Sequence, residues 1–427
     1  MHKLFKGISK LYGIADSPGK VLRGAAMREV QSMDQAWIWV EDGKIKSIGN
    51  QSDAQRLEGV HFDEVIDLQQ QEVMPGFVDS HTHIVFASPR NEEFVMRIEG
   101  AGYEEIAAAG GGILNSARKL QLCSEEELYL AASERLKWMI CHGTTTVEIK
   151  SGYGLTLESE LKMLRVIKRL KQDFPVKVRA TFLGAHAFPT EYKGNPESYV
   201  AAVIDQMIPA VSAENLANHV DVFCDKGFFT PAQTTSIIEA AAKFGLKAKI
   251  HANELGITGG VQVAIGQEAW SADHLEYLGE EEFQLFAQVA GKETETIPVG
   301  LPGCSYFLGI PYANLRRLIK EGCAVALATD FNPGSSPVCS LQMIWSLACT
   351  QMKLLPQEAF HAITCNAART LRLENEVGSL APGMDANFVT FKLKDSLSTI
   401  PYFFGKNHAQ QVFVMGNKVA ENGNYLA

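Results

Sequence analysis

Short apolar, β-branched runs alternate with amphipathic segments through the middle of this 427-residue chain, and this alternation limits its fold more than any other feature. A strand followed by a helix, repeated many times, is typical of parallel sheets whose strands are joined by helical crossovers. The candidate strands are Gly76–His83, Thr144–Lys150, Val178–Gly184, His219–Asp225, Ala248–Asn253, Trp270–His274, Glu295–Val299 and Ala324–Asp330. Eight such strands with helices between them favour a closed (β/α)8 barrel over an open doubly wound sheet.

Helix start and stop signals support this alternation. Ser124 and Glu127 have the spacing of a capping box, and Gly143 follows that segment as a helix stop. Thr230 is a suitable N-cap because Pro231 follows it at the first helical position. Both predicted helices lie between candidate strands, as a barrel requires.

The two ends of the chain have β character and lack helical periodicity. The segment Trp37–Ile48 has Asp42-Gly43 at its centre and predicts a hairpin with a type I′ turn. Ala386–Phe391 and Gln411–Met415 have a similar β pattern near the other end. Because chain ends often lie close in space, we expect them to form one small sheet domain together. The predicted division is residues 1–75 with 384–427 as the composite domain, and 76–383 as the barrel.

Composition excludes several classes of partner. The formal net charge is −10, and no basic run is present, so a nucleic-acid partner is not expected. No stretch approaches 18 apolar residues, and the first segment lacks a signal-peptide core, so we expect no membrane partner. The eight cysteines are scattered without a C-x-x-C motif, which is typical of reduced thiols in a cytoplasmic protein.

Ligand-type side chains gather where the predicted strands end, which is where barrel active sites lie. The first strand closes with His81-Thr-His83, and a period of two directs both imidazoles to the same side. His251, His274 and Asp330 stand at the ends of the fifth, sixth and eighth strands. Imidazoles with a carboxylate suit zinc or iron, with a position left open for water.

Several of these segments carry a family resemblance. Pro75-Gly-Phe-Val-Asp-Ser-His-Thr-His83 resembles the first-strand signature of the metal-dependent amidohydrolase superfamily, and the later His251, His274 and Asp330 follow its order. Other segments resemble one family within it, the imidazolonepropionases of histidine degradation. They are Glu148–Leu155, Phe182–His186, His251–Glu254, Ser271–Leu275 and Ala328–Ser335. The similarity runs from about residue 35 to residue 415 and is specific, since a general amidohydrolase need share only the metal ligands.

The resemblance implies a fold and a set of site residues. The fold is a TIM-like (β/α)8 barrel of the amidohydrolase type with a small β-sandwich domain formed by the N- and C-terminal segments. One metal ion per subunit, Zn²⁺ or Fe³⁺, is implied, with ligands at His81, His83, His251 and Asp330. Substrate contacts are implied at Arg90, Tyr153, His186, Glu254, Asn332, Gly334 and Ser335.

The end of the fourth strand bears on the number of metal ions. Binuclear members of the superfamily use a carboxylated lysine there as a bridging ligand. In this chain the strand ends Phe223-Cys-Asp225, with Lys226 just beyond it. We take this to favour a single metal ion.

The resemblance also implies a reaction. The substrate would be 4-imidazolone-5-propanoate, the product N-formimidoyl-L-glutamate, and the usual state a cytosolic homodimer. An arginine fork matches a carboxylate bidentately, so Arg90 suits the propanoate tail. Asp330 or Glu254 would accept the proton of the attacking water, and His274 would stabilise the developing oxyanion or shuttle the proton.

Two other functions compete with this interpretation. A purine or pyrimidine deaminase would share the barrel, one metal ion and the strand-end histidines. It would need a pocket for a flat base, and Arg90 and Tyr153 speak against it. A non-catalytic scaffold would be expected to lose metal ligands, whereas every expected ligand is present here.

Overall fold

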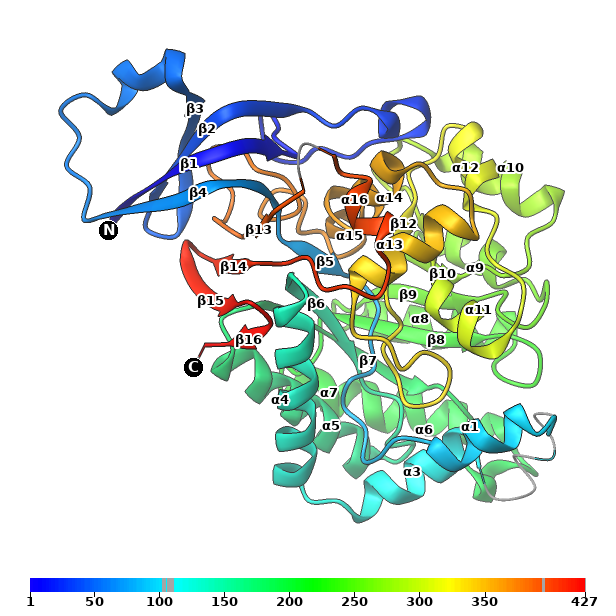
Figure 1. The fold of residues 1–427 in the computed structure, drawn as a ribbon. Coiled ribbons are helices and arrows are strands. Elements are labelled where there is room, and N and C mark those ends of the chain that lie inside the picture. The colour runs from blue at the N-terminus through cyan, green and yellow to red at the C-terminus, as the bar shows by residue number, and fades with distance from the viewer. Residues whose placement is uncertain (102–104, 106–110, 394–395, 427) are drawn as a thin grey trace.

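Two eight-stranded sheets organise the molecule (Figure 1). The computed structural model describes residues 1–101, 105, 111–393 and 396–426. The central sheet is the barrel, and the second sheet is built from strands near both chain ends.

The central sheet contains eight parallel strands that pair in chain order. They are β5 (Phe77–Asp79), β6 (Thr144–Lys150), β7 (Lys177–Ala185), β8 (His219–Cys224), β9 (Lys247–Ala252), β10 (Ser271–His274), β11 (Ile297–Gly300) and β12 (Ala326–Leu327). Each of the eight predicted strands is therefore present, and the barrel prediction is confirmed. β5 and β12 are shorter than predicted, because the chain leaves the regular ladder before it reaches the residues of the site.

The barrel closes between its first and last strands through a few specific bonds. Thr82 and Phe331 form an isolated parallel bridge, and the Asp330 amide donates to the His81 carbonyl over 3.0 Å. The closing seam of the barrel is thus formed by the same short segments that carry three predicted metal ligands, His81, His83 and Asp330.

Helices cover the outside of the barrel (Figure 1). They are α1 (Asn91–Ile98), α3 (Ile113–Leu122), α4 (Glu125–Cys141), α5 (Leu157–Asp173), α6 (Pro196–Ala202), α7 (Ile208–Ala213), α8 (Pro231–Ala242), α9 (Gly260–Gly266), α10 (Glu280–Val289), α11 (Pro302–Leu308), α12 (Leu315–Lys320), α13 (Leu341–Thr350), α14 (Pro356–Ala362), α15 (Cys365–Thr370) and α16 (Thr399–Tyr402). Short 3-10 segments occur at Gly24–Arg28, Gln51–Leu57 and Thr190–Tyr192, and a π-helical turn at Val203–Met207.

The predicted helix caps are confirmed. Ser124 and Glu127 exchange both bonds of a capping box at the start of α4, and Thr230 does the same with Gln233 at the start of α8. These bonds satisfy backbone donors that have no partner within the helix.

The second sheet joins both ends of the chain in the order β16-β15-β14-β13-β4-β1-β2-β3. Its strands are β1 (His2–Tyr12), β2 (Ser32–Glu41), β3 (Lys44–Asn50), β4 (Glu64–Pro75), β13 (Phe388–Phe391), β14 (Gln411–Val414), β15 (Asn417–Glu421) and β16 (Asn424–Tyr425). Only the pairing of β1 with β4 is parallel among the strands of this sheet that the structure describes. The predicted hairpin turn is confirmed, since Asp42 and Gly43 have φ angles of 50° and 81°.

This sheet folds over its own core like a sandwich. Phe5 of β1 meets Phe388 of β13 and Phe413 of β14 at ring-centroid distances of 4.9 and 5.3 Å. In a flat sheet, β1 and β14 would lie about 14 Å apart, because neighbouring strands are about 4.8 Å apart. The sheet is therefore strongly curved, and its two halves face each other across aromatic side chains.

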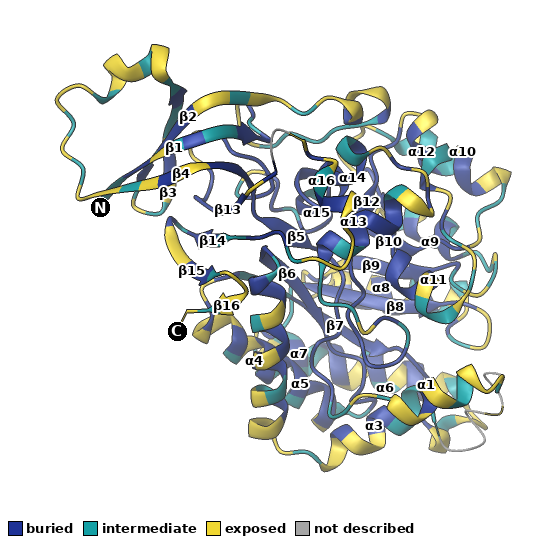
Figure 2. Ribbon diagram, in the orientation of Figure 1, coloured by how far each residue is buried: buried dark blue, intermediate teal, exposed yellow. Residues whose placement is uncertain are grey.

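Burial is deepest in the barrel. Figure 2 shows the barrel strands almost wholly buried, whereas the surrounding helices turn exposed faces outward. Within the described part of the chain, no helix is both long enough and apolar enough to cross a lipid bilayer.

Candidate active site

The predicted site residues meet at one end of the barrel. A cavity of about 820 Å³ opens where the barrel strands finish. Every predicted site residue except His81 lines it, and His81 lies fully buried beside His83. The predicted residues that line it are His83, Arg90, Tyr153, His186, His251, Glu254, His274, Asp330, Asn332, Gly334 and Ser335.

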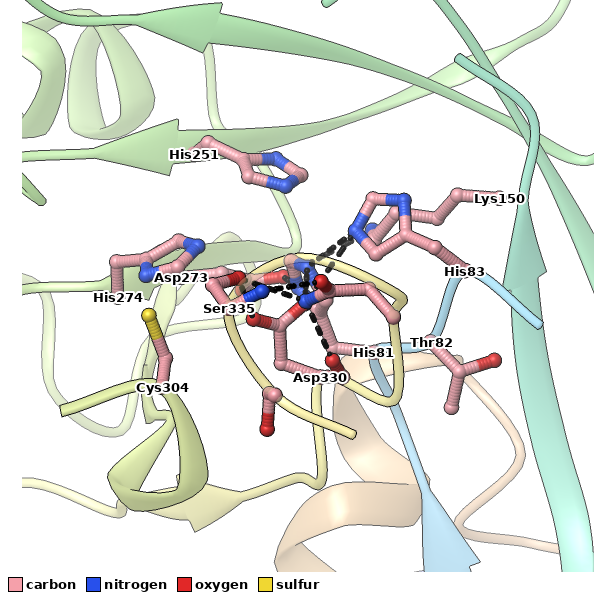
Figure 3. A network of polar contacts seen from close by, with 12 residues as sticks. His81, Thr82, His83, Lys150, His251, Asp273, His274, Cys304, Asp330 and Ser335 are labelled. Carbon is pink, nitrogen blue, oxygen red and sulfur yellow. Dashed lines mark hydrogen bonds and ion pairs between the residues drawn. The ribbon is translucent and has the colours of Figure 1, made fainter. Parts of the chain in front are cut away.

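The four predicted metal ligands converge at the bottom of this cavity (Figure 3). The Nε2 atoms of His81 and His83 are 3.2 Å apart, and Asp330 Oδ1 lies 3.6 and 3.5 Å from them. A ligand atom of His251 lies within 4.8 Å of those of both other histidines. All four side chains are buried.

Carboxylates behind two of these histidines fix how their rings face the centre. Asp273 Oδ2 lies 2.6 Å from His81 Nδ1, and Asp221 Oδ2 lies 2.9 Å from His251 Nδ1. Carboxylates that hold the outer nitrogen of a ligating imidazole select its tautomer and orientation. Each pairing leaves Nε2 free to face inward, which is the arrangement that a metal ion requires.

The protonation state of the histidines also fits a metal ion. Burial and the nearby Lys150 lower the pKa of His81 well below its usual value, and burial and neighbouring imidazoles lower the pKa of His83. The pKa of His251 is likewise lowered by burial. Neutral imidazoles are the form that binds metals, so the donor set fits zinc or iron.

A buried cluster of charges lies beneath the ligands. Lys150 Nζ donates to Glu148 Oε1 over 3.0 Å and to Asp221 Oδ2 over 2.7 Å. Lys249 Nζ lies 3.6 Å from Asp273 Oδ2 and 3.8 Å from Glu148 Oε2. The two lysines therefore hold the carboxylates that in turn lie against the predicted metal ligands.

From the sequence, no role was assigned to Asp221 or to Asp273. A usable signal was nevertheless present. Charged residues occupy every second position in otherwise apolar strands, as in Glu148 and Lys150 of β6 or Lys249 and His251 of β9. That period directs them to the same face of the strand, which here is the interior of the barrel.

The backbone is strained where it presents the site. His274 and Leu275 both have positive φ, 82° and 69°, and so do Asp330 at 52° and Asn253 at 57°. Non-glycine residues adopt this region only where the surrounding structure imposes it. Strand ends at three places in the barrel are thus bent to direct side chains into the cavity.

His274 lies between two carboxylates. Its Nε2 is 3.6 Å from Glu254 Oε2, and its Nδ1 is 3.5 Å from Glu276 Oε2. Burial alone would lower the pKa of His274, but the two carboxylates outweigh it and raise the pKa well above its usual value. Burial raises the pKa of Asp330 to about 8 and also raises that of Glu254. The site therefore combines a cationic imidazole with carboxyl groups that hold a proton unusually well.

Arg90 lines the wall of the cavity. In the sequence it immediately precedes α1. Its Nε donates to Ser116 Oγ over 2.8 Å, and its Nη1 lies 3.9 Å from Glu93 Oε2. Its Nη2 is buried and has no hydrogen-bond partner among the described residues. A Cβ at position 334 would lie 2.3 Å from Arg90 Nη1, so Gly334 leaves the space that the guanidinium occupies. A guanidinium that lines a cavity suits a carboxylate ligand.

Tyr153 and His186 stand beside His83. The His186 and His83 rings stack with centroids 5.6 Å apart, and the Tyr153 ring lies 5.4 Å from His186. His186 Nδ1 lies 2.9 Å from the Gly152 carbonyl and donates to it, which leaves Nε2 as an acceptor. Burial lowers the pKa of His186 to about 3, so this imidazole is neutral.

The loop after β12 is held together by Asn332. The Asn332 side chain donates to the Asp330 carbonyl and to Ser335 Oγ, both over 2.8 Å. Its Oδ1 accepts from the amides of Gly334 and Ser335. Asn332 therefore shapes the loop that carries Asp330 at one end and the cavity wall at the other.

Lys226 lies exposed beyond the end of β8. It does not line the cavity. The number of metal ions stays a prediction.

The sequence matches known families over most of its length. A family model described as the amidohydrolase family matches residues 73–419. An imidazolonepropionase of Flavobacterium johnsoniae is 45% identical over 416 residues, which cover 97% of this chain and 99% of that protein. One from Christiangramia forsetii is 43% identical, covering 98% of this chain and all of that protein.

Solved structures resemble the fold at much lower identity. An adenosine deaminase from Xanthomonas campestris, with bound zinc, has a TM-score of 0.73 and 15% identity, and covers 99% of this chain and 94% of that one. A guanine deaminase from C. acetobutylicum, with bound guanine, has a TM-score of 0.72 and 17% identity, and covers 98% of this chain and 100% of that one. These two similarities show the fold alone.

Proposed function

The chain belongs to the amidohydrolase family and, within it, to the imidazolonepropionases, and from this premise we propose how its residues open the ring of 4-imidazolone-5-propanoate. The reaction adds water to the cyclic amide and yields N-formimidoyl-L-glutamate. The observation that carries the proposal is that Arg90 lines the same cavity as the ligand cluster, with a buried Nη2 that has no hydrogen-bond partner among the described residues. A substrate with a carboxylate tail and a hydrolysable ring could place the tail at Arg90 and the ring at the ligand cluster.

The metal centre would use His81, His83, His251 and Asp330 for one zinc or iron ion per subunit. When bound, such an ion makes hydroxide available near neutral pH and polarises a carbonyl group. The protein contributes the orientation of the ligands, through Asp273 and Asp221 and the lysines behind them.

Arg90 would bind the propanoate tail through a charge-assisted bond that its free N–H can supply. Tyr153 offers a hydroxyl to the same carboxylate or to the ring. His186 offers a neutral acceptor nitrogen to a ring N–H. These three groups would orient the ring carbonyl toward the ligand cluster.

Proton transfer would involve the two carboxyl groups and His274. Asp330 is a buried carboxylate within 3.6 Å of two imidazoles of the ligand cluster and is suited to accept the proton of the attacking water, with Glu254 as the alternative acceptor. The cationic His274 would stabilise the oxyanion that forms on the ring carbonyl. The ring C–N bond then breaks, and the departing nitrogen takes up the proton.

We also infer the setting in which the chain works. We propose a cytoplasmic homodimer that acts on a small molecule and has neither a nucleic-acid nor a membrane partner. The net charge of −10 supports the exclusion of nucleic acid. We further propose that residues 1–75 with 384–427 form one domain and residues 76–383 the other, because β4 pairs with β13 and continues into β5.

The test is to supply purified, metal-loaded protein with 4-imidazolone-5-propanoate and, separately, with purines and pyrimidines. We expect the imidazolone absorbance to disappear without release of ammonia. Release of ammonia from a nucleobase, with no loss of the imidazolone, would instead identify a deaminase. An inactive protein that binds no metal would identify a scaffold.

A further inference from the structure

A second group of potential metal ligands lies beside the proposed centre. It consists of Glu254 after β9, His274 at the end of β10 and Cys304 in the first turn of α11. One ligand atom of each lies within 4.8 Å of those of the others. Cysteine, histidine and carboxylate side chains are the ligand types that zinc binds in proteins.

The three side chains converge on one point, at which Glu254 is partly exposed and lines the cavity. Cys304 Sγ lies 3.7 Å from Glu254 Oε1, and His274 Nε2 lies 3.6 Å from Glu254 Oε2. Cys304 is fully buried, and His274 is 3% exposed. Figure 3 shows the Cys304 sulfur directed toward the His274 imidazole. A cysteine that only filled space in the core would not need to face two ligand-type side chains.

The arrangement includes the outer carboxylate that zinc sites commonly have. Glu276 Oε2 lies 3.5 Å from His274 Nδ1, on the far nitrogen of the ring. Ser305 Oγ donates to Glu276 Oε1 over 3.3 Å and holds that carboxylate in place. This ion pair lies on the Nδ1 side of the ring, and Nε2 is the nitrogen that faces Glu254.

We propose that Glu254, His274 and Cys304 form a second zinc site, separate from the proposed centre, whose occupation inhibits the enzyme. When zinc binds, the Cys304 thiol and the His274 imidazolium each release a proton to solvent, and the sulfur and the neutral imidazole become ligands. The ion then occupies the carboxylate and the imidazole that proton transfer needs, so hydrolysis stops. The inhibition rests on the proposed function, whereas the binding of metal does not.

Cobalt provides a probe that separates the two centres. Protein carrying one equivalent of zinc is titrated with Co²⁺, while the near-ultraviolet thiolate-to-cobalt absorption and the rate of hydrolysis are followed together. The four ligands of the proposed centre are nitrogen and oxygen donors, so a thiolate band can arise only at a cysteine. We expect the band to saturate at one cobalt per chain and hydrolysis to fall at least about 10-fold in parallel.

Variants assign the band to its residue. In Cys304→Ser and Cys304→Ala the band should be lost, and more than about 10-fold more cobalt should be needed for the same inhibition, since even outer-shell changes weaken metal affinity 10- to 100-fold. Cys349→Ser is the matched control, because Cys349 is a half-buried cysteine of α13 outside the group, and it should keep both responses. Thermal unfolding of each variant confirms that it is folded.

Three results decide the proposal. Absence of a thiolate band in the unmodified protein, or its persistence in both Cys304 variants, overturns the site. A saturated band with unchanged hydrolysis overturns the inhibitory role. A saturated band in a protein that never hydrolyses the imidazolone supports the metal site and contradicts the proposed function, so the two failures are distinguishable.

Discussion

The floor and the wall of the cavity are built differently. The floor is the ligand cluster, whose imidazoles are held from behind by buried carboxylates and lysines. The wall is formed by Arg90, Tyr153 and the loop 332–335. Arg90 there keeps one buried N–H with no partner among the residues described.

This difference teaches which groups are committed to the protein and which are reserved for a ligand. Buried carboxylates and lysines hold the ligand side chains from behind with little freedom, so the floor is suited to a fixed coordination geometry. Loop residues can keep unpaired hydrogen-bond donors because a bound ligand can accept from them. Changes in the floor should therefore affect catalysis and stability, whereas changes in the wall should affect substrate binding.

The largest effect is expected from Asp330→Asn. The variant keeps the shape of the floor but removes the proposed proton acceptor, so kcat should fall about 10²- to 10⁴-fold. Turnover is measured together with bound metal, which separates loss of the proton acceptor from loss of the ion. Asp205→Asn, at an exposed position, is the control and should be unchanged. Normal hydrolysis by Asp330→Asn would contradict its role.

Lys150→Met tests whether the buried charges support the floor. The change leaves Glu148 and Asp221 without their lysine, and removing one partner of a buried ion pair costs about 3–5 kcal/mol. We expect a lower free energy of unfolding in urea and weaker metal binding. Lys168→Met, on the exposed face of α5, should stay within about 0.5 kcal/mol of the unmodified protein. Equal stability of the two variants would contradict the proposal that the buried ion pairs of Lys150 stabilise the floor.

Arg90→Gln tests the wall. Losing a charge-assisted bond worth about 1.5–3 kcal/mol should raise KM roughly 10- to 100-fold, with a smaller effect on kcat. The comparison is Arg165→Gln, whose guanidinium pairs with Glu214 on the surface and should leave both constants unchanged. An unchanged KM in Arg90→Gln would place the carboxylate of the substrate elsewhere.

The smallest effect is expected from Tyr153→Phe. One neutral hydrogen bond is worth about 0.5–1.5 kcal/mol, so KM should rise about 2- to 10-fold. Tyr129→Phe removes a surface hydroxyl that bonds to Asp173 and serves as the control. If Tyr153→Phe were to lose kcat as strongly as Asp330→Asn, the hydroxyl would belong to the catalytic floor instead.

Periodicity and strand ends predicted the barrel and the ligand cluster because both depend on local pattern. The eight strands were found from apolar runs, and His81 and His83 from their spacing at the end of one. The composite sheet was predicted from β character at the two ends of the chain. Its strong curvature was not predicted, and it is evident only from the contact between Phe5 and Phe413.

The support of the site was harder to predict because it depends on contacts between distant segments. The bond from His81 to Asp273 joins residues 192 positions apart, and the one from Lys150 to Asp221 spans 71. The positive φ of His274 and the position of Cys304 against Glu254 also follow from the closed barrel. No local spacing encodes them.

The pairing of β4 with β13 has a consequence for synthesis on the ribosome. Met74 lies in register with Val389, so the edge of β4 stays uncovered until more than 300 further residues have been made. An uncovered strand edge is a template for pairing with other chains. The barrel strand that precedes the first predicted metal ligands follows β4 almost directly, and the nascent chain is therefore expected to be prone to aggregation until β13 has emerged.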